Sequence, residues 1–299
     1  MTPRATKRDQ TIPLGIVGGG PVWEDRYRAA ARSLTRGRVA AVFSPQPCIG
    51  KMLAEETGGQ LFPSLRRMLD HPGVKALLVM ESGWVRDWAI AWATARQMPV
   101  FVASPMDAEL LDLASSLAEQ EADGAVIVPG SLLRATPAAL RLRELVATKL
   151  GPIQTIEIDL SGGLDSQLIG AIDWCRSLVS STVSEISRET TADGPLFVMS
   201  CGRRTPLTPP VRTEIRILST ESHPLVARVT CERGAAELTG ESQIRWRTEL
   251  EAADESLEGE RPAEQVLLDL FLRRVVGGVV PVPSWADLHA ACQLWVSVR

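Results

Sequence analysis

Three consecutive glycines near the start of the chain form the first pattern with a chemical meaning. They follow the apolar run 12–18 and precede a helical pattern, which is the usual context of a phosphate-binding turn. Glycine allows positive φ and a close approach of the backbone, and the start of a helix offers free N–H groups to phosphate oxygens. The turn therefore predicts a dinucleotide site, and a tight turn without a ligand is the alternative. The residues of this predicted site are Gly18, Gly19, Gly20, Pro21, Val22 and Trp23.

Two positions near the turn depart from the usual dinucleotide pattern. In G-x-G-x-x-G, Trp23 stands where the third glycine or an alanine belongs. An indole there either displaces the helix or turns toward the phosphate site and partly fills it. At the end of the second predicted strand, Ser44 stands where an acid would bind the ribose hydroxyls. Because serine can accept a 2′-phosphate, the sequence favours NADP over NAD by a small margin, and loss of the nucleotide stays open.

The elements that position the turn alternate between strand and helix. Predicted strands cover 12–18, 38–45, 74–80, 99–104 and 124–130, and predicted helices cover 24–37, 51–59, 64–71, 87–97 and 106–122. Such alternation predicts right-handed crossovers and a doubly wound parallel sheet. We expect a flexible tail over 1–11, a Rossmann-like dinucleotide-binding domain over 12–134 and a second domain over 135–299.

The second half of the chain has a different pattern. Apolar and polar residues alternate over 153–160, 211–218, 225–232 and 241–248, which is typical of an antiparallel sheet with one exposed face. Helical patterns cover 166–180 and 263–276. The acidic stretch 251–260 is expected to be a solvated loop. The predicted fold class is therefore α/β, with a Rossmann sheet followed by an α+β domain that has an open, mostly antiparallel sheet.

Composition limits the classes of function. The 299 residues are 45% apolar, and a net charge of −4 with a pI near 5.6 argues against a protein built to hold nucleic acid. Five cysteines without a CxxC pair and three scattered histidines favour a reducing cytoplasm and predict no metal site. No apolar run approaches the length of a membrane-spanning helix.

Tryptophans form two further patterns. Trp84, Trp88 and Trp92 recur every four residues and are expected to pack as one stripe against the sheet or a partner. Trp246 lies on an alternating strand and is expected to face another subunit, since open sheets commonly bury one face by pairing.

The order of segments resembles the glucose-fructose oxidoreductase/inositol dehydrogenase (Gfo/Idh/MocA) family from about residue 13 to residue 295. The segments that carry the resemblance are LGIVGGG, RVAAVFSP, ARQMPVFVASP, LGPIQTIEIDL, LIGAIDWCRSLVS and FLRRVVGGVVPVPSWADLHAACQLW. The resemblance implies a Rossmann domain, a C-terminal domain whose open sheet often forms oligomers, and NAD(P)-dependent chemistry on a hydroxyl-bearing carbon of a sugar or cyclitol.

The positions that carry this family's chemistry differ here. Ser104 replaces the lysine of the family's Glu-Lys-Pro, which touches the nicotinamide side and the reacting oxygen. Gly170 stands at the position of the proton-transfer histidine, and Ser166 at that of the assisting aspartate. Serine is no base at neutral pH, and hydride transfer from an alcohol needs one, which contributes about 10²–10⁴-fold. The hydride chemistry of the family is therefore expected to be disabled.

Three carboxylates remain as candidate bases. Asp165 lies one place from the expected aspartate, and Glu81 begins the Glu-Ser-Gly that replaces the family's Thr-Pro-Asn. Asp173 is expected to cap or pair within its helix, and Glu81 to face solvent or an arginine. On the cofactor side, the resemblance adds Ser44, Glu81 and Ser104 to the glycine turn.

Three functions stay open. The favoured one is a non-enzymatic pseudoenzyme that keeps the fold and the nucleotide as a sensor or binding protein. The second is an active oxidoreductase with a rearranged site, and the third is an interaction protein that uses the open sheet alone. The expected partners are a small molecule such as a sugar or polyol and a second copy bound through the C-terminal sheet, with no nucleic acid and no membrane.

Overall fold

The computed structural model describes residues 11–103, 108–161, 165–179, 183–192, 194–202, 209–218 and 224–299. Ser104, the first ten residues of the predicted tail and the side chain of Asp165 lie outside these described parts. The chain forms two compact units. Unit 1 holds the residues up to 103, Glu109–Gly130 and Glu264–Ala286, and unit 2 holds Ser131–Ala263 and Asp287–Arg299.

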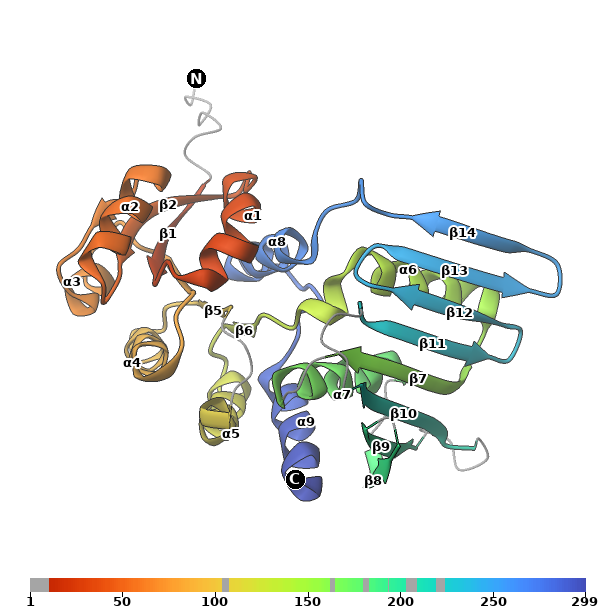
Figure 1. Ribbon diagram of the computed structural model, residues 1–299. Coiled ribbons are helices and arrows are strands. Elements are labelled where there is room, and N and C mark those ends of the chain that lie inside the picture. Colours follow the sequence, from red (N-terminus) through yellow and green to blue (C-terminus); the bar gives the residue numbers. More distant parts are fainter. Residues whose placement is uncertain are drawn as a thin grey trace. The chain divides into compact units, whose positions relative to one another are not determined.

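Unit 1 is built on a parallel sheet of six strands in the order β3-β2-β1-β4-β5-β6 (Figure 1). This order places the switch point of the sheet between β1 and β4, where doubly wound folds bind their ligands. The strands are β1 (Ile12–Val17), β2 (Gly37–Phe43), β3 (Gln60–Leu61), β4 (Ala76–Val79), β5 (Val100–Val102) and β6 (Ile127–Pro129). The helices are η2 (Val22–Tyr27), α1 (Arg28–Arg32), α2 (Pro47–Thr57), α3 (Leu65–Leu69), α4 (Gly83–Thr94), α5 (Ala108–Ala122) and α8 (Ala263–Val275).

The central strands of unit 1 are apolar along their whole length because helices cover both faces of a doubly wound sheet. Every residue of β4 and β5 is buried. Helix α8 belongs to this unit, whereas the sequence pattern assigned its residues to the second domain. The Phe271 ring on α8 lies 5.7 Å from that of Phe101 on β5, and Glu264 accepts a hydrogen bond from Arg26. These partners are more than 150 residues away in the chain, so local patterns do not reveal them.

Unit 2 contains a sheet of eight strands in the order β14-β13-β12-β11-β7-β10-β9-β8. All neighbours pair antiparallel except β10 and β7. The strands are β7 (Ile153–Ser161), β8 (Val183–Thr191), β9 (Gly194–Cys201), β10 (Val211–Leu218), β11 (Val226–Cys231), β12 (Gly234–Thr239), β13 (Gln243–Thr248) and β14 (Ala252–Ser256). Its helical segments are η3 (Leu132–Ala135), α6 (Pro137–Leu145), η4 (Val146–Leu150), α7 (Asp165–Val179) and α9 (Trp285–Val298).

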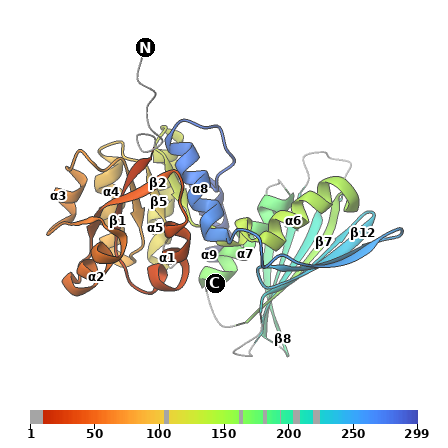
Figure 2. The ribbon, with the colours of Figure 1, turned by 90° about the horizontal axis from the view of Figure 1, so that it is seen from above.

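Helices α6 and α7 cover one face of this sheet (Figure 2), and the apolar residues of the alternating strands point to that face. The predicted fold class is therefore confirmed. The prediction of a loop over 251–260 is wrong, because Ala252–Ser256 form the edge strand β14. The prediction interpreted the acidic side chains as a sign of a solvated loop. They lie instead on an edge strand, and the neighbouring strand carries arginines. In the described part of the chain, no helix is long and apolar enough to cross a membrane.

Candidate functional site

The glycine turn lies directly after β1, at the switch point of the unit 1 sheet. Gly18 and Gly19 have φ angles of +106° and +139°, which L side chains rarely adopt. A Cβ on Gly18 would lie 3.0 Å from the backbone carbon of Met80 and 3.1 Å from the nitrogen of Glu81. A Cβ on Gly20 would meet no atom within 4 Å. The first two glycines are thus required by the turn itself, whereas the third borders open space.

The turn presents unused hydrogen-bond donors. The N–H groups of Trp23 and Glu24 both donate to the Gly20 carbonyl, and that of Gly18 donates to Phe43. Within the described chain, the N–H groups of Gly19, Gly20 and Val22 have no partner, and Pro21 carries none. Three free donors, with open space beside Gly20, are the chemistry of a phosphate cradle.

The indole of Trp23 does not occupy the space beside Gly20. The segment after the turn, η2, is wound as a π-helix, and Trp23 within it is 1% exposed. Its side chain lies with Ile49, Met52 and Leu53 of α2 around a cavity of about 20 Å³. The wide π-helical turn and the burial against α2 are how the fold accommodates an indole at the position of a glycine.

The end of β2 carries a hydroxyl and no acid. Ser44 is buried, and its Oγ accepts a hydrogen bond of 3.2 Å from the Gln46 N–H. The hydroxyl proton is therefore still available to an oxygen of a ligand. Glu81, at the end of β4, is half-buried, and its Cβ would lie 3.2 Å from a Cβ at Gly18. The structure thus brings Glu81 next to the glycine turn.

In unit 2, Asp173 of α7 is held in an ion pair. Arg134, on η3, donates its Nε to Asp173 Oδ2 at 2.7 Å and its Nη2 to Oδ1, and its Nη1 lies 3.2 Å from Asp287 Oδ2. Burial raises the pKa of the Asp173 carboxyl, and the charge of Arg134 opposes that rise. The expected pairing within the helix is wrong, since the partner comes from η3. Both oxygens of Asp173 are occupied by this arginine.

The other two predicted positions lie on the same helix. Ser166 and Gly170 are both half-buried and stand one turn apart. A Cβ on Gly170 would meet no atom within 4 Å, so the position of the family's histidine opens onto empty space. Among the residues that the structure describes, no group of three or more His, Cys, Asp or Glu is arranged to hold a metal ion.

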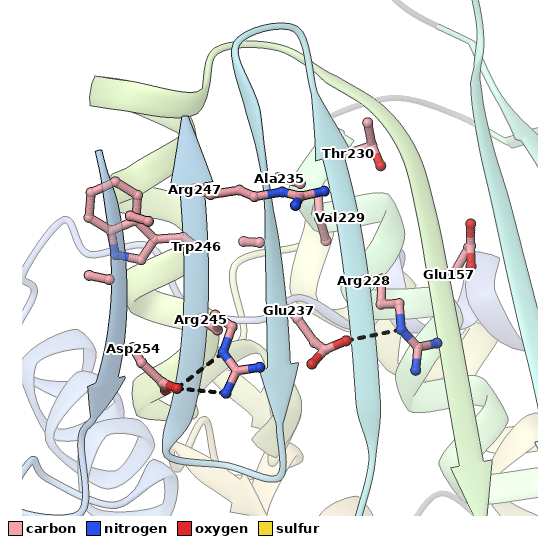
Figure 3. A pocket seen from close by; sticks show the side chains of 13 residues that line it. Glu157, Arg228, Val229, Thr230, Ala235, Glu237, Arg245, Trp246, Arg247 and Asp254 are labelled. Atoms are coloured by element: carbon pink, nitrogen blue, oxygen red, sulfur yellow. Dashed lines mark hydrogen bonds and ion pairs between the residues drawn. The ribbon is translucent and has the colours of Figure 1, made fainter. Parts of the chain in front are cut away.

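A second cavity, of about 650 Å³, lies on the face of the unit 2 sheet that carries the charged side chains (Figure 3). One row of paired residues there alternates in charge across five strands. The residues of this row are Glu157, Arg228, Glu237, Arg245 and Asp254. Arg228 donates to Glu237 at 3.0 Å, and Arg245 donates to Asp254 at 2.7 Å. The face is therefore a self-paired charge row rather than an apolar surface.

The indole of Trp246 is not part of this open face. It is 4% exposed, its Nε1 donates to Glu255 at 2.6 Å, and the Lys149 amine lies 4.5 Å from the ring centroid. Glu255 also accepts two hydrogen bonds from Arg141 on α6. The prediction that Trp246 faces another subunit is wrong, because alternation along β13 turns it to the face that packs against α6.

The comparisons with known proteins agree with this geometry. No family model matches the chain. An inositol 2-dehydrogenase of Ralstonia nicotianae is 25% identical over 133 residues, which are 44% of this chain and 40% of that protein. The chain spans 29–40% of the length of the curated relatives it matches, all named inositol 2-dehydrogenase. The solved structure of a dehydrogenase from Chromobacterium violaceum superposes with a TM-score of 0.82 at 12% identity, covering 97% of this chain and 94% of that one.

These partial matches and the shared fold support the resemblance of the chain to the Gfo/Idh/MocA family. Another solved structure with this fold, an oxidoreductase from Agrobacterium radiobacter, contains NAD⁺, L-tartaric acid and magnesium. Its TM-score is 0.78 at 11% identity, with 96% of this chain and 95% of that one covered. Both superpositions extend over nearly the whole length of this chain and of the neighbour.

The sequence did not reveal the arginine that pairs with Asp173. Arg134 is 39 residues from Asp173 and 153 residues from Asp287, and no local spacing links three such positions. Only the fold brings η3, α7 and α9 together. A buried acid at a helical core position is the one available signal, because such an acid requires a cation.

Proposed function

We propose that the protein binds NAD or NADP at the glycine turn and acts as a nucleotide-dependent sensor or binding protein without the family's hydride-transfer chemistry. The single observation that carries the nucleotide is the set of three free N–H groups at Gly19, Gly20 and Val22, with open space beside Gly20. These donors would hold the pyrophosphate, and the Ser44 hydroxyl and Glu81 carboxylate would face its ribose groups. When bound, the nicotinamide supplies a hydride acceptor or donor.

The proposal that hydride transfer is lost is based on residues of unit 2. Gly170 has no side chain to move a proton, and Asp173 has both oxygens engaged by Arg134. Ionisation of a substrate hydroxyl requires a free base at that atom. Ser166 offers only a hydroxyl, which is no base at neutral pH. The described residues of α7 can therefore orient a ligand by hydrogen bonds but hold no group that would accept its proton.

The second candidate is an active NAD(P)-dependent oxidoreductase acting on a sugar, cyclitol or related hydroxy compound. Two observations favour it. Solved oxidoreductases superpose on 96–97% of this chain, so no unit of the fold has been lost. Glu81 also lies next to the glycine turn, where a carboxylate would be close to a bound nucleotide.

The partners that we propose are a sugar or polyol and a second copy bound through the unit 2 sheet. The charge row on that sheet supports pairing between copies, because alternating positive and negative residues can complement the same row on a partner. We also propose a reducing compartment, the cytoplasm, since all five cysteines are free thiols.

Titration of the purified protein with NADH and NADPH, followed by tryptophan and nucleotide fluorescence, tests the proposal. Saturable binding without turnover on a panel of polyols and ketoses is the expected result. Oxidation or reduction of the nucleotide with any of these substrates would support the second candidate instead. No binding of either nucleotide would favour an interaction protein.

A further inference from the structure

The outer face of α4 carries a stripe of three indoles, which we call the tryptophan stripe: Trp84 and Trp88 are exposed and Trp92 is half-buried. Trp84 is 64% exposed and Trp88 is 53% exposed. The Trp84 and Trp88 rings meet edge to face with centroids 5.4 Å apart, and Trp88 stacks on Trp92 at the same distance. Of the two expected packings, against the sheet or against a partner, the first is wrong for Trp84 and Trp88. Residues on the opposite side of α4, including Ala89 and Ile90, are buried instead.

Such a stripe is unusual on a helix that faces water. An exposed, contiguous aromatic surface with a polar rim marks an interaction site, and tryptophan is the residue most enriched in the binding hot spots of interfaces. The rim is present here: Arg96 pairs with Asp70 at 2.7 Å, and Asp87 accepts a hydrogen bond from Arg86 at 2.8 Å. The indoles are already ordered by contact with one another, which lowers the entropic cost of docking.

We propose that the tryptophan stripe binds the same stripe of a second copy, with the two α4 helices antiparallel about a two-fold axis at Trp88. The spacing supports this occupant. Trp84 and Trp92 lie four residues on either side of Trp88, about 6 Å along the helix axis. A two-fold axis at Trp88 therefore brings Trp84 of each copy to the level of Trp92 of the other. A surface that is its own complement in this way fits an isologous dimer.

The helix dipoles agree with an antiparallel pair. Two antiparallel α4 helices oppose their dipoles favourably, whereas a parallel pair would set like ends side by side. Arg96, beyond the C-terminal end of α4, is already paired with Asp70 and belongs to the polar rim of the contact.

The exposed area is suited to the centre of an interface. With about 250 Å² for a tryptophan side chain, Trp84 and Trp88 together expose roughly 300 Å² per copy. A standard interface buries about 800 Å² per partner. The two indoles thus supply more than a third of that area, and the rim around α3 and α4 is available for the rest.

Cross-linking tests the contact directly while leaving every indole in place. Ala91 is exposed on the same face of α4, and Ala29 is an exposed alanine on α1. In a background in which the exposed Cys48 is changed to serine, Ala91→Cys and Ala29→Cys are each treated with a short bismaleimide. A covalent dimer formed by Ala91→Cys and not by Ala29→Cys is the expected result. Equal yields from both variants, or no dimer from either, would overturn the proposal.

Sedimentation equilibrium supplies the second measurement. The double variant Trp84→Ser/Trp88→Ser is expected to weaken one association step at least about 30-fold, the effect of removing a hot spot. Met52→Ser, at a position on α2 that is 60% exposed, serves as the control and should leave that step unchanged. Melting curves confirm that each variant is folded. Unaltered association of the double variant, or binding of the stripe to phosphatidylserine vesicles by a protein that stays monomeric, would contradict it.

Discussion

Gly20→Asp is expected to remove nucleotide binding without unfolding the protein. Gly20 is flanked by two of the free N–H groups, those of Gly19 and Val22. A Cβ at Gly20 meets no atom within 4 Å, and the residue does not need positive φ. A side chain therefore fits the folded turn, but it enters the space into which the phosphate must come.

The size of the effect follows from charge. A carboxylate about 5 Å from a phosphate oxygen, at an effective dielectric constant of about 20, costs about 3 kcal/mol per pair of unit charges. This corresponds to at least about 100-fold weaker binding. Gly20→Ala is the matched control, because it adds the Cβ without the charge and should change stability by less than about 1 kcal/mol.

Fluorescence titration with NADH and NADPH measures the dissociation constants of the three proteins for each nucleotide, and thermal melting measures stability. We expect affinity to fall in the order wild type, Gly20→Ala, Gly20→Asp, with melting temperatures close to one another. If Gly20→Asp binds either nucleotide within threefold of the wild type, the phosphate does not lie at this turn and the reasoning fails. A strong loss of stability in either variant would instead show that the space beside Gly20 is not open.

Three further predictions concern unit 2. Asp173→Asn removes the buried counter-charge of Arg134 and leaves it only the half-exposed Asp287, which is expected to cost about 3 kcal/mol, seen as a fall in Tm of roughly 10 °C; an unchanged Tm would show that the ion pair is not structural. Hydrogen bonds from Arg141 hold the pKa of Glu255 below its ordinary value, so this carboxylate stabilises the fold above that value and ceases to do so as the pH falls through the lowered one. At neutral pH, Glu255→Gln should lower the stability by about 1 kcal/mol and the Tm accordingly. This difference in Tm between the variant and the wild type should therefore disappear in acid. A difference that grows in acid would contradict the direction of the pKa shift. Gly170→His is expected to be neutral to within about 0.5 kcal/mol in chemical denaturation, because the side chain enters open space on a helix that glycine weakens, and marked destabilisation would show that the space is filled.

The layout of the fold could be predicted from periodicity. Apolar runs such as 74–80 and 99–104 contain β4 and β5, because a strand buried on both faces has no polar side to interrupt it. The glycine turn could be predicted for a similar reason, since its positive φ values limit the residues that fit. Both signals are local. They depend on a residue and its near neighbours in the chain.

The parts that could not be predicted depend on contacts between distant segments. Strand β14 forms by pairing its backbone with β13, where Arg245 also meets Asp254, and composition cannot show such a partner strand. The same applies to Asp173, whose carboxylate is a candidate base in the sequence and a partner of Arg134 in the structure. A tryptophan at helical spacing is usually a core residue, and only the solvent exposure of Trp84 reveals that this stripe faces outward.

Hydride transfer from protein-bound NADH or NADPH is the most direct measurement. The protein is saturated with each reduced nucleotide and then mixed with a panel of sugar ketones and inosose-type cyclic ketones, while the nucleotide absorbance is followed through many hours. We predict that the nucleotide stays bound and reduced, because no free base or acid in the described part of α7 can move a proton at the reacting oxygen. Oxidation that depends on both the protein and one of the ketones would contradict this and establish an active oxidoreductase.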